Sequence, residues 1–130
     1  METKVVVDFA DAISHADVDR MCSLMTDDHL FIDSQDNKME GKETMRIAWI
    51  AYFGLFPDYK IEIEELFENG SSICILGHAS GTYKSLTYKS NNNHWRIPAA
   101  WKAVIKDNLV KHWQVYADNL IVVEIINNNK

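Results

Sequence analysis

The chain has 130 residues and a mass of 15.0 kDa, which is the length of a single domain. Hydrophobic residues make up 47% of it and charged residues 25%, so it has enough apolar material for a packed core and too little polar bias for a disordered chain. The formal net charge is −6 and the basic residues are scattered, which argues against binding to nucleic acid or to an anionic membrane surface, because both require a basic patch.

The first residues and the cysteines indicate the compartment. The N-terminal segment lacks the long apolar stretch of a secretory signal and carries Asp8 and Asp11. No segment approaches about 18 consecutive apolar residues, the length that a transmembrane helix requires. Cys22 and Cys74 each lie within an apolar run, which is typical of buried thiols in a reducing compartment. We therefore expect a cytoplasmic protein.

Three stretches in the first half of the chain show helical periodicity. Apolar residues recur every three or four positions over residues 3–15 and, on one broad face, over residues 42–56. Asp17 is a candidate N-cap for a short helix between them, and Pro57 ends the third helix. A short extended segment at residues 29–33 separates the second helix from the third.

The second half of the chain has the pattern of long antiparallel strands. Residues 59–64 alternate strictly between apolar and polar side chains, as in a half-buried strand. The dipeptide Asn69-Gly70 is a strong hairpin signal. Pro98 cannot donate a backbone hydrogen bond, which predicts a sheet edge or a bulge. The later strands are expected at residues 72–83, 95–105 and 109–118, with an Asn-rich loop at 91–93 and a turn at 106–108.

These elements predict an α+β domain. We expect three N-terminal helices packed on one face of a curved antiparallel sheet, with a pocket between the helices and the sheet. The domain is expected over residues 1–122, followed by a polar C-terminal tail at residues 123–130. The exposed strands and the many apolar sheet residues predict a homodimer joined through the sheets.

Two stretches resemble the SnoaL-like domains of the nuclear transport factor 2-like superfamily. Residues 27–33 (DDHLFID) are similar to the acidic helix end and strand of ketosteroid isomerases. Residues 97–103 (IPAAWKA) and 112–119 (HWQVYADN) resemble the last two strands of SnoaL-like proteins and limonene epoxide hydrolases. The resemblance extends over about residues 5–120 and implies a cone-shaped, cystatin-like fold related to polyketide cyclases. This superfamily includes isomerases, cyclases, hydrolases and binding modules, so the resemblance does not define one reaction.

Asp33 matches the proton-shuttling base of the ketosteroid isomerases in this resemblance. A carboxylate at the rim of an apolar pocket has a raised proton affinity and can abstract a carbon-bound proton. The alternative is that Asp33 opens the turn before Asn37 by hydrogen bonding to the local backbone. The isomerase oxyanion hole does not carry over, because its Tyr and its protonated Asp fall on Phe9 and Ala100. A steroid isomerase of that design is therefore not expected.

Asp118 corresponds to the acid–base Asp of epoxide hydrolases of this fold and lies one residue from that of SnoaL-like cyclases. The hydrolase triad does not carry over, because Pro98 stands two residues after Arg96, where a second Asp is needed. The alternative is that Asp118 caps the turn at Asn119. His78 lies in a strand among small neighbours, and it is either a second acid–base group or a core or interface histidine.

The last expected strand has two chemically different faces. If Asp118 faces the pocket, Tyr116 lines it too and contacts the substrate. Otherwise the polar face contacts a second subunit, or a bulge near the strand end brings Trp113 and Asp118 to the same side. The sequence leaves these alternatives open. One face carries His112, Gln114, Tyr116 and Asp118, and the other carries Trp113, Val115 and Ala117.

Aromatic side chains are expected at the pocket wall, and metal ligands are not. Trp49, Tyr52 and Trp101 are the rings that we expect to approach a cavity and contact substrate, while the other rings form core. The chain has no His-x-x-x-His or Cys-x-x-Cys spacing and no Gly-rich phosphate loop. We therefore expect no metal and no cofactor.

Two functions follow from these observations. The first is a cofactor-free SnoaL-like isomerase, cyclase or hydrolase acting on a small apolar carbonyl compound, with Asp118 or Asp33 moving the proton and His78 and Tyr116 as partners. The second is a non-catalytic ligand-binding or dimerisation module of the same fold. An enzyme requires an open pocket, converging polar groups and a carboxylate of raised proton affinity, whereas a module has its carboxylates in turns and its cavity filled by aromatic rings.

Overall fold

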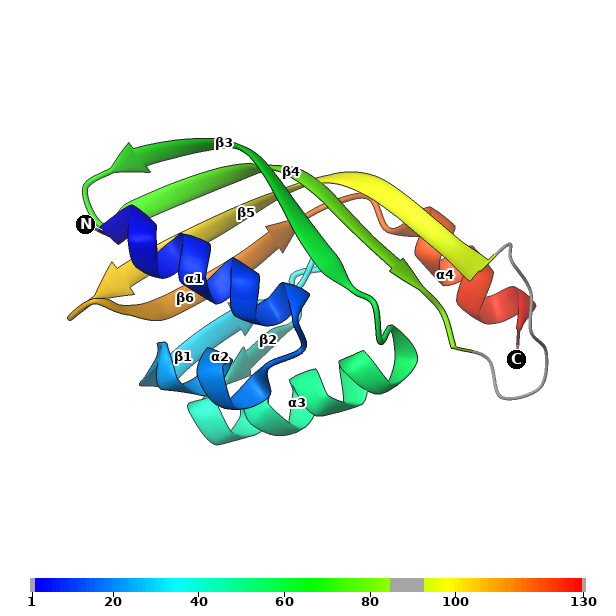
Figure 1. Ribbon diagram of the computed structural model, residues 1–130, viewed down its shortest axis with the longest axis horizontal. Helices are drawn as coiled ribbons and strands as arrows, with labels where there is room; N and C mark the ends of the chain where they lie inside the picture. The colour runs from blue at the N-terminus through cyan, green and yellow to red at the C-terminus, as the bar shows by residue number, and fades with distance from the viewer. Residues whose placement is uncertain (1, 85–92, 130) are drawn as a thin grey trace.

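The chain folds into one six-stranded sheet with helices on one of its faces (Figure 1). The computed structural model describes residues 2–84 and 93–129, and within them there are four helices. The predicted α+β class, with N-terminal helices packed on a curved sheet, is confirmed. The elements are α1 (Glu2–Ser14), α2 (Val18–Ser23), β1 (Met25–Ile32), β2 (Lys38–Glu40), α3 (Lys42–Leu55), β3 (Lys60–Asn69), β4 (Ser72–Thr82), β5 (His94–Lys106), β6 (Leu109–Tyr116) and α4 (Leu120–Asn128).

The first three helices begin and end close to the predicted positions. The side chain of Asp17 caps α2 by accepting a hydrogen bond from the backbone N–H of Arg20 at 3.1 Å. Helix α3 ends at Leu55, two residues before Pro57, which lacks the N–H that a further helical turn requires. Helix α1 buries an apolar face that includes Val6, Phe9 and Ile13.

The strand order in the sheet is β2-β1-β6-β5-β4-β3. Strands β3 to β6 form the predicted antiparallel meander, and β4 and β5 bend along their length (Figure 1). One pair differs from the expected antiparallel sheet, because β1 runs parallel to β6, with Phe31 opposite Trp113. This pairing joins segments that are about 80 residues apart in the sequence; across it, the side chain of His29 contacts the backbone oxygen of Val110, 81 positions further along the chain. No local sequence pattern predicts such a pairing.

Both predicted hairpin turns are present. Gly70 has a φ of 61°, and Asp107 and Asn108 have φ values of 53° and 62°, the left-handed conformations that tight hairpin turns require. The predicted edge at Pro98 is also confirmed, because the pairing of β5 with β6 extends only from Ala100 to Lys106. Pro98 therefore lies where one side of β5 has no neighbouring strand to receive an N–H.

Strand β3 contains a bulge that approaches β4 closely. The register between the two strands shifts between Ile63 and Glu65. A Cβ atom on Gly77 would lie 1.8 Å from the backbone oxygen of Glu62. The bulge therefore requires glycine at this position of β4.

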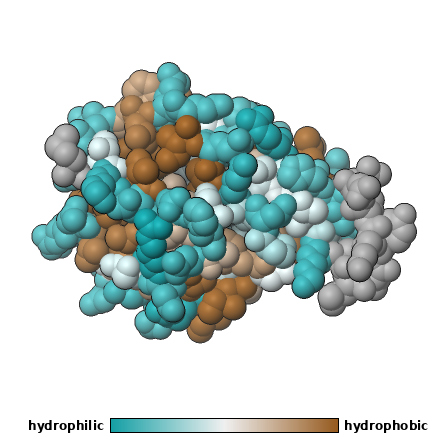
Figure 2. Space-filling view, in the orientation of Figure 1, coloured by the Kyte–Doolittle hydropathy of each residue, from teal (hydrophilic) through white to brown (hydrophobic). Residues whose placement is uncertain are grey.

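The core lies between the sheet and the helices, and its largest members are fully buried rings such as Phe9, Trp101 and Trp113. Along β5 the odd-numbered residues from 95 to 105 are buried, as the alternation of a one-sided sheet predicts. The visible surface is mostly hydrophilic, with apolar side chains on the outward side of α3 (Figure 2). Ile47 and Ile50 of that helix are 72% and 56% exposed.

The end of the chain differs from the prediction. The polar tail expected at residues 123–130 is replaced by helix α4, which extends to Asn128. The Asn-rich end dominates the sequence pattern, but Val122 is buried and Ile126 packs against the core. Directly after the helix, the side-chain amide of Asn129 donates a hydrogen bond to the carbonyl oxygen of Ile125 at 2.7 Å. The expected Asn-rich loop lies outside the described residues, apart from the buried Asn93.

No helix within residues 2–84 and 93–129 is both long enough and apolar enough to cross a membrane.

Candidate functional site

A cavity of about 420 Å³ lies between α3, α4 and one end of the sheet, so the predicted pocket between helices and sheet is present. Its wall is largely apolar and comes from the end of β1 and the following loop, from α3 and the loop after it, from strands β4 to β6 and from α4. This size lies within the range of small-molecule sites, about 300–1,000 Å³. The segment predicted to be a tail therefore supplies part of the site, through Val123 and Ile126.

The sheet supplies the cavity with small and apolar side chains because its strands alternate. Trp95, Ile97 and Ala99 of β5 face the cavity from successive inward positions. On β6 the inward parity is that of Val115 and Ala117, and both line the cavity. The apolar face of the last strand, whose orientation the sequence leaves open, is therefore the face toward the cavity.

Aromatic rings form much of the remaining wall. Trp49 lies at steep angles to two neighbours, with an interplanar angle of 75° to Phe31 and 83° to Tyr52. Tyr52 and Tyr59 are nearly perpendicular, at 89° with centroids 5.1 Å apart. These are edge-to-face contacts, so the rings pack against one another into a continuous aromatic wall.

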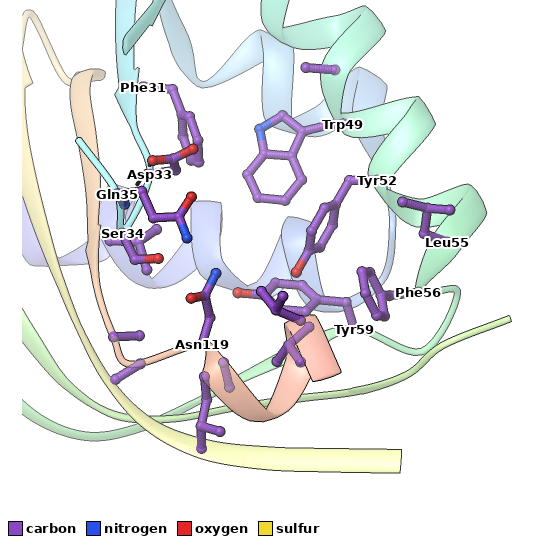
Figure 3. A pocket seen from close by; sticks show the side chains of 18 of the residues that line it. Phe31, Asp33, Ser34, Gln35, Trp49, Tyr52, Leu55, Phe56, Tyr59 and Asn119 are labelled. Atoms are coloured by element: carbon purple, nitrogen blue, oxygen red, sulfur yellow. Dashed lines mark hydrogen bonds between the residues drawn. The ribbon is translucent and has the colours of Figure 1, made fainter. Parts of the chain in front are cut away.

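Polar groups from opposite walls point toward the same volume (Figure 3). The hydroxyls of Tyr52 and Tyr59 approach from α3 and the start of β3, the amide of Asn119 from the residue before α4, and the amide of Gln35 from the loop after β1. Burial raises the pKa of both tyrosines well above the ordinary value. Their hydroxyls therefore stay protonated and neutral, although a hydrogen bond with the Trp101 side chain opposes part of the shift at Tyr59.

Asp33 lines the cavity and is also held by its own loop. Its Oδ1 accepts hydrogen bonds from the backbone N–H groups of Gln35 at 2.9 Å and Asn37 at 3.0 Å, and its Oδ2 accepts one from Asn37 Nδ2 at 3.0 Å. Burial raises the pKa of this carboxyl, but these hydrogen bonds together lower it more, and the net pKa lies below the ordinary value of 3.8. Asp33 is therefore an ionised carboxylate, and the raised proton affinity expected from an apolar pocket is wrong.

Asp118 does not reach the cavity. It is exposed, and its Oδ1 accepts a hydrogen bond from the backbone N–H of Leu120 at 3.0 Å, the turn-capping alternative. Tyr116 shares its parity, is 53% exposed and lies on the outer face of the sheet opposite Ala100. The predicted grouping of these two residues in the pocket is wrong, because the apolar side chains of the strand take the inward positions.

His78 also lies away from the cavity, because its parity on β4 is outward. Its Nδ1 lies 3.1 Å from Glu64 Oε2, and Glu62 accepts a hydrogen bond from Arg96 Nε nearby on the same face at 2.8 Å. The structure does not bring His78 together with Asp33 or Asp118. Its surroundings are those of an exposed ion-pair group on the outer face.

Among the predicted aromatic residues, Trp49 and Tyr52 line the cavity and Trp101 does not. Trp101 faces inward but is fully buried in the core, further along β5 than the cavity. Their contact with substrate stays a prediction. Tyr59 and Asn119 also line the cavity and were not predicted. Tyr59 could have been found from its shared parity with Ile61 and Ile63, whereas the place of Asn119 depends on the position of α4.

Within the described part of the chain, no group of three or more His, Cys, Asp or Glu side chains could hold a metal ion. The cavity-lining residues that belong to the described ranges include neither Lys, Arg nor His. The polar groups that the described lining offers are therefore one carboxylate, two neutral phenols, the amides of Gln35 and Asn119, one serine hydroxyl and the indole N–H groups of Trp49 and Trp95.

A helix-covered, strongly bent sheet with a cavity at one end defines the class of small α+β pocket proteins with a cystatin-like fold. Residues 6–122 match the SnoaL-like domain family, and the chain belongs to this family. No curated protein matches the chain in sequence.

Solved structures of low sequence identity share the fold. A putative SnoaL-like polyketide cyclase from Shewanella denitrificans has a TM-score of 0.83 at 14% identity, over 98% of this chain and 97% of that one. A limonene epoxide hydrolase-like enzyme from Mycobacterium tuberculosis has a TM-score of 0.79 at 12% identity, over 98% and 90%. A ketosteroid isomerase-like protein from Catenulispora acidiphila, solved in complex with trimethylamine, has a TM-score of 0.80 at 16% identity, over 92% and 89%. These similarities show the fold, which hosts several functions.

Proposed function

We propose that this chain binds a small, mostly apolar molecule in the cavity between α3, α4 and the sheet. The observation that carries the proposal is an open cavity of about 420 Å³ whose apolar wall is interrupted by a few polar groups that converge on its centre (Figure 3). That combination is typical of ligand sites, where apolar area supplies affinity and a few polar groups fix orientation. The Catenulispora protein, solved with trimethylamine, supports a small ligand for a cavity of this fold.

Ligand binding is favoured over acid–base catalysis because of the state of Asp33. A general base works best with a pKa near the working pH. Three hydrogen bonds hold the pKa of Asp33 below its ordinary value, which makes it a weak proton acceptor. The cavity is open as an enzyme requires, but its carboxylate is bound in a turn as in a binding module.

A second candidate is a cofactor-free enzyme acting on a small apolar carbonyl compound. It is favoured by one observation, that Asp33 faces the cavity opposite the protonated hydroxyls of Tyr52 and Tyr59 (Figure 3). In such an enzyme Asp33 would accept a carbon-bound proton while a tyrosine hydroxyl donates a hydrogen bond to the carbonyl oxygen. Turnover by wild-type protein that is lost in Asp33→Asn would favour this candidate over simple binding.

A thermal-shift screen tests the primary proposal. Small apolar carbonyl compounds, lactones, epoxides and alcohols would be screened against the wild type and against Ala117→Met, whose longer side chain enters the cavity. A ligand at a hundredfold excess over its Kd stabilises a protein by about 2.7 kcal/mol. We expect hits with the wild type that are weakened in Ala117→Met.

Ala100→Met is the matched control, because Ala100 lies on the outer face of β5 opposite Tyr116. It should bind the same compounds as the wild type. Hits that bind all three proteins equally would place the binding outside the cavity and contradict the proposal.

A further inference from the structure

We propose that the molecule bound in the cavity is a small organic cation, an alkylated ammonium that also carries one oxygen acceptor. The inference rests on the proposed function, because it names the charge and class of the ligand that the cavity takes.

The first argument is the charge of the wall. Among the residues of the described part of the chain that line the cavity, Asp33 is the only one with a charged side chain. Burying an anionic ligand beside this carboxylate would leave two like charges without a counter-ion, which is strongly unfavourable. A cation gains Coulomb attraction from the same carboxylate, and the attraction is stronger in a cavity than in water. A neutral ligand gains no such attraction between net charges and can at most donate a hydrogen bond to the carboxylate.

The second argument is that the Asp33 charge is fixed in place. The three hydrogen bonds from Gln35 and Asn37 orient both oxygens, and they favour the ionised form. A carboxylate has about four acceptor sites, so one remains for a ligand N–H or for contact with a methylated nitrogen. Asp33 lies on the wall across the cavity from Trp49 and Tyr52 (Figure 3).

The third argument is the aromatic wall. Phe31, Trp49, Tyr52 and Tyr59 meet at interplanar angles of 75°, 83° and 89° in sequence around the cavity. Aromatic faces attract cations through their quadrupoles, and groups of rings that enclose a volume are the sites at which proteins recognise alkylated ammonium groups. The neutral oxygens of the tyrosines add partial negative charge without a competing cation.

The acceptor on the ligand follows from the buried indoles. Trp49 and Trp95 both line the cavity, are only 6% and 4% exposed, and have ring N–H groups without a hydrogen-bond partner among the described residues. The nitrogen of Trp49 lies on the side of the ring toward Phe31 and Asp33 (Figure 3). The nitrogen has no solvent-accessible surface in the structure, so a ligand hydroxyl or ether oxygen would accept from this buried donor only where the indole ring shifts to expose its edge.

Three probes of nearly equal shape and different charge test the inference. These are choline, its neutral isostere 3,3-dimethylbutan-1-ol and the anion 3,3-dimethylbutanoate, titrated into the protein by isothermal calorimetry, with the fluorescence of Trp49 and Trp95 as a second readout. We expect choline to bind about tenfold more tightly than the alcohol, which corresponds to about 1.4 kcal/mol, because aromatic faces attract a cation and not its neutral isostere. The anion should bind most weakly.

Two matched variants locate the charge that is responsible. Asp33→Asn keeps an oxygen that can accept the two backbone hydrogen bonds but removes the charge, and it should reduce the preference for choline over the alcohol to about threefold or less. Asp118→Asn removes the same charge from another turn outside the cavity, where Oδ1 accepts from Leu120 N–H. It should keep the wild-type preference.

The outcomes separate this inference from the proposed function. The cationic class of the ligand is contradicted if the alcohol binds as tightly as choline, or if Asp118→Asn loses the preference as Asp33→Asn does. Neither result contradicts ligand binding in the cavity. If none of the three probes binds at millimolar concentration, and the screen with Ala117→Met also finds no ligand, both are wrong. Trp49→Leu should weaken choline more than the alcohol, and equal weakening of both would contradict the role of the ring face.

Discussion

Asp33 has two roles at the scale of single residues. Its carboxylate holds the loop after β1 in place by accepting three hydrogen bonds. The same carboxylate places one negative charge at the cavity. The bonds that fix the loop also lower the proton affinity, so the structural role works against a role as general base. Asp33 therefore acts mainly through its charge.

Asp33→Ala should lower the free energy of unfolding at neutral pH by about 1–3 kcal/mol, because donors in the loop lose a charged acceptor. The folded-state pKa of Asp33 is depressed, so the stability it contributes is present above the ordinary value of 3.8 and is lost as the pH falls through the lower folded-state value. Urea unfolding should therefore show a difference between wild type and variant that shrinks in strong acid. Equal stability of the two proteins at neutral pH would contradict this account.

His29, in the core, is also expected to make the free energy of unfolding fall as the pH is lowered. It is fully buried, and its Nδ1 lies 2.7 Å from the carbonyl oxygen of Val110, so Nδ1 carries the proton and donates. Burial lowers the pKa of this imidazole below the ordinary value of 6.5, although the hydrogen bond to Val110 opposes the shift. The unfolded chain then binds a proton at a higher pH than the folded protein does.

Stability should therefore fall as the pH is lowered below about 6.5, by at most about 1.4 kcal/mol per pH unit for this one proton. His29→Gln keeps a donor near Val110 and removes the titration, so its free energy of unfolding should change less between pH of about 6.5 and 5. Urea titrations across this range measure both slopes. The same slope in wild type and variant would rule out His29 as the source.

At the scale of elements, replacing two different glycines by alanine is expected to change the stability of the protein in opposite directions. Gly77→Ala should destabilise the protein by more than about 2 kcal/mol, since its Cβ would overlap the backbone oxygen of Glu62 at 1.8 Å and displace the β3 bulge. Gly54→Ala is the matched control, because a Cβ there meets nothing within 4 Å and alanine favours helix by up to about 1 kcal/mol. Thermal unfolding measures both. A neutral Gly77→Ala would mean that β3 and β4 are not this close.

Most elements could be predicted from the sequence because their signals are local. Asp17 caps α2, Pro57 follows α3, and the turns at Asn69-Gly70 and Asp107-Asn108 require left-handed conformations that these residues adopt readily. The buried positions of β5 follow the alternation of a sheet with one covered face. Each of these signals lies within a few residues of the structure that it determines.

The candidate site could be predicted only in part because it depends on long-range packing. The parallel pairing of β1 with β6 and the docking of α4 bring together segments that are distant in sequence. Alternation along the last strand places Val115 and Tyr116 on opposite faces but does not show which face lines the cavity. The family resemblance favoured Asp118, which lies outside the cavity. Trp101 points inward from β5 but does not line the cavity. Inward residues at its end of the strand lie in the packed core, whereas those at the other end line the cavity.

At the scale of the whole molecule, the two ends of the sheet differ. One part is covered by α1 and filled by Phe9, Trp101 and Trp113, while the other leaves a cavity beneath α3 and α4. The filled part supplies the hydrophobic stabilisation, since each buried large ring contributes through the apolar area it removes from water. The cavity is therefore an opening in an otherwise packed core.

The homodimer joined through the sheets stays a prediction. The outer face of the sheet exposes Phe67, Leu76 and Tyr116, which would be covered in such a dimer. Tyr116→Glu should shift the protein toward monomer in sedimentation velocity by placing like charges at the interface. Ile47→Glu on α3, which is more exposed but on another surface, should leave the association unchanged. A monomeric wild type would contradict the dimer.

The most direct test of the central claim, that the cavity is a ligand site, is protein-observed NMR with a library of small fragments of mixed charge. The account predicts that binding fragments perturb the backbone amides of cavity residues such as Tyr52, Ala99 and Val115, with cationic fragments giving the largest shifts. Amides on the outer face, such as those of Phe67 and Leu76, should stay unchanged. Perturbations confined to the outer face, or no binding by any fragment, would contradict the claim.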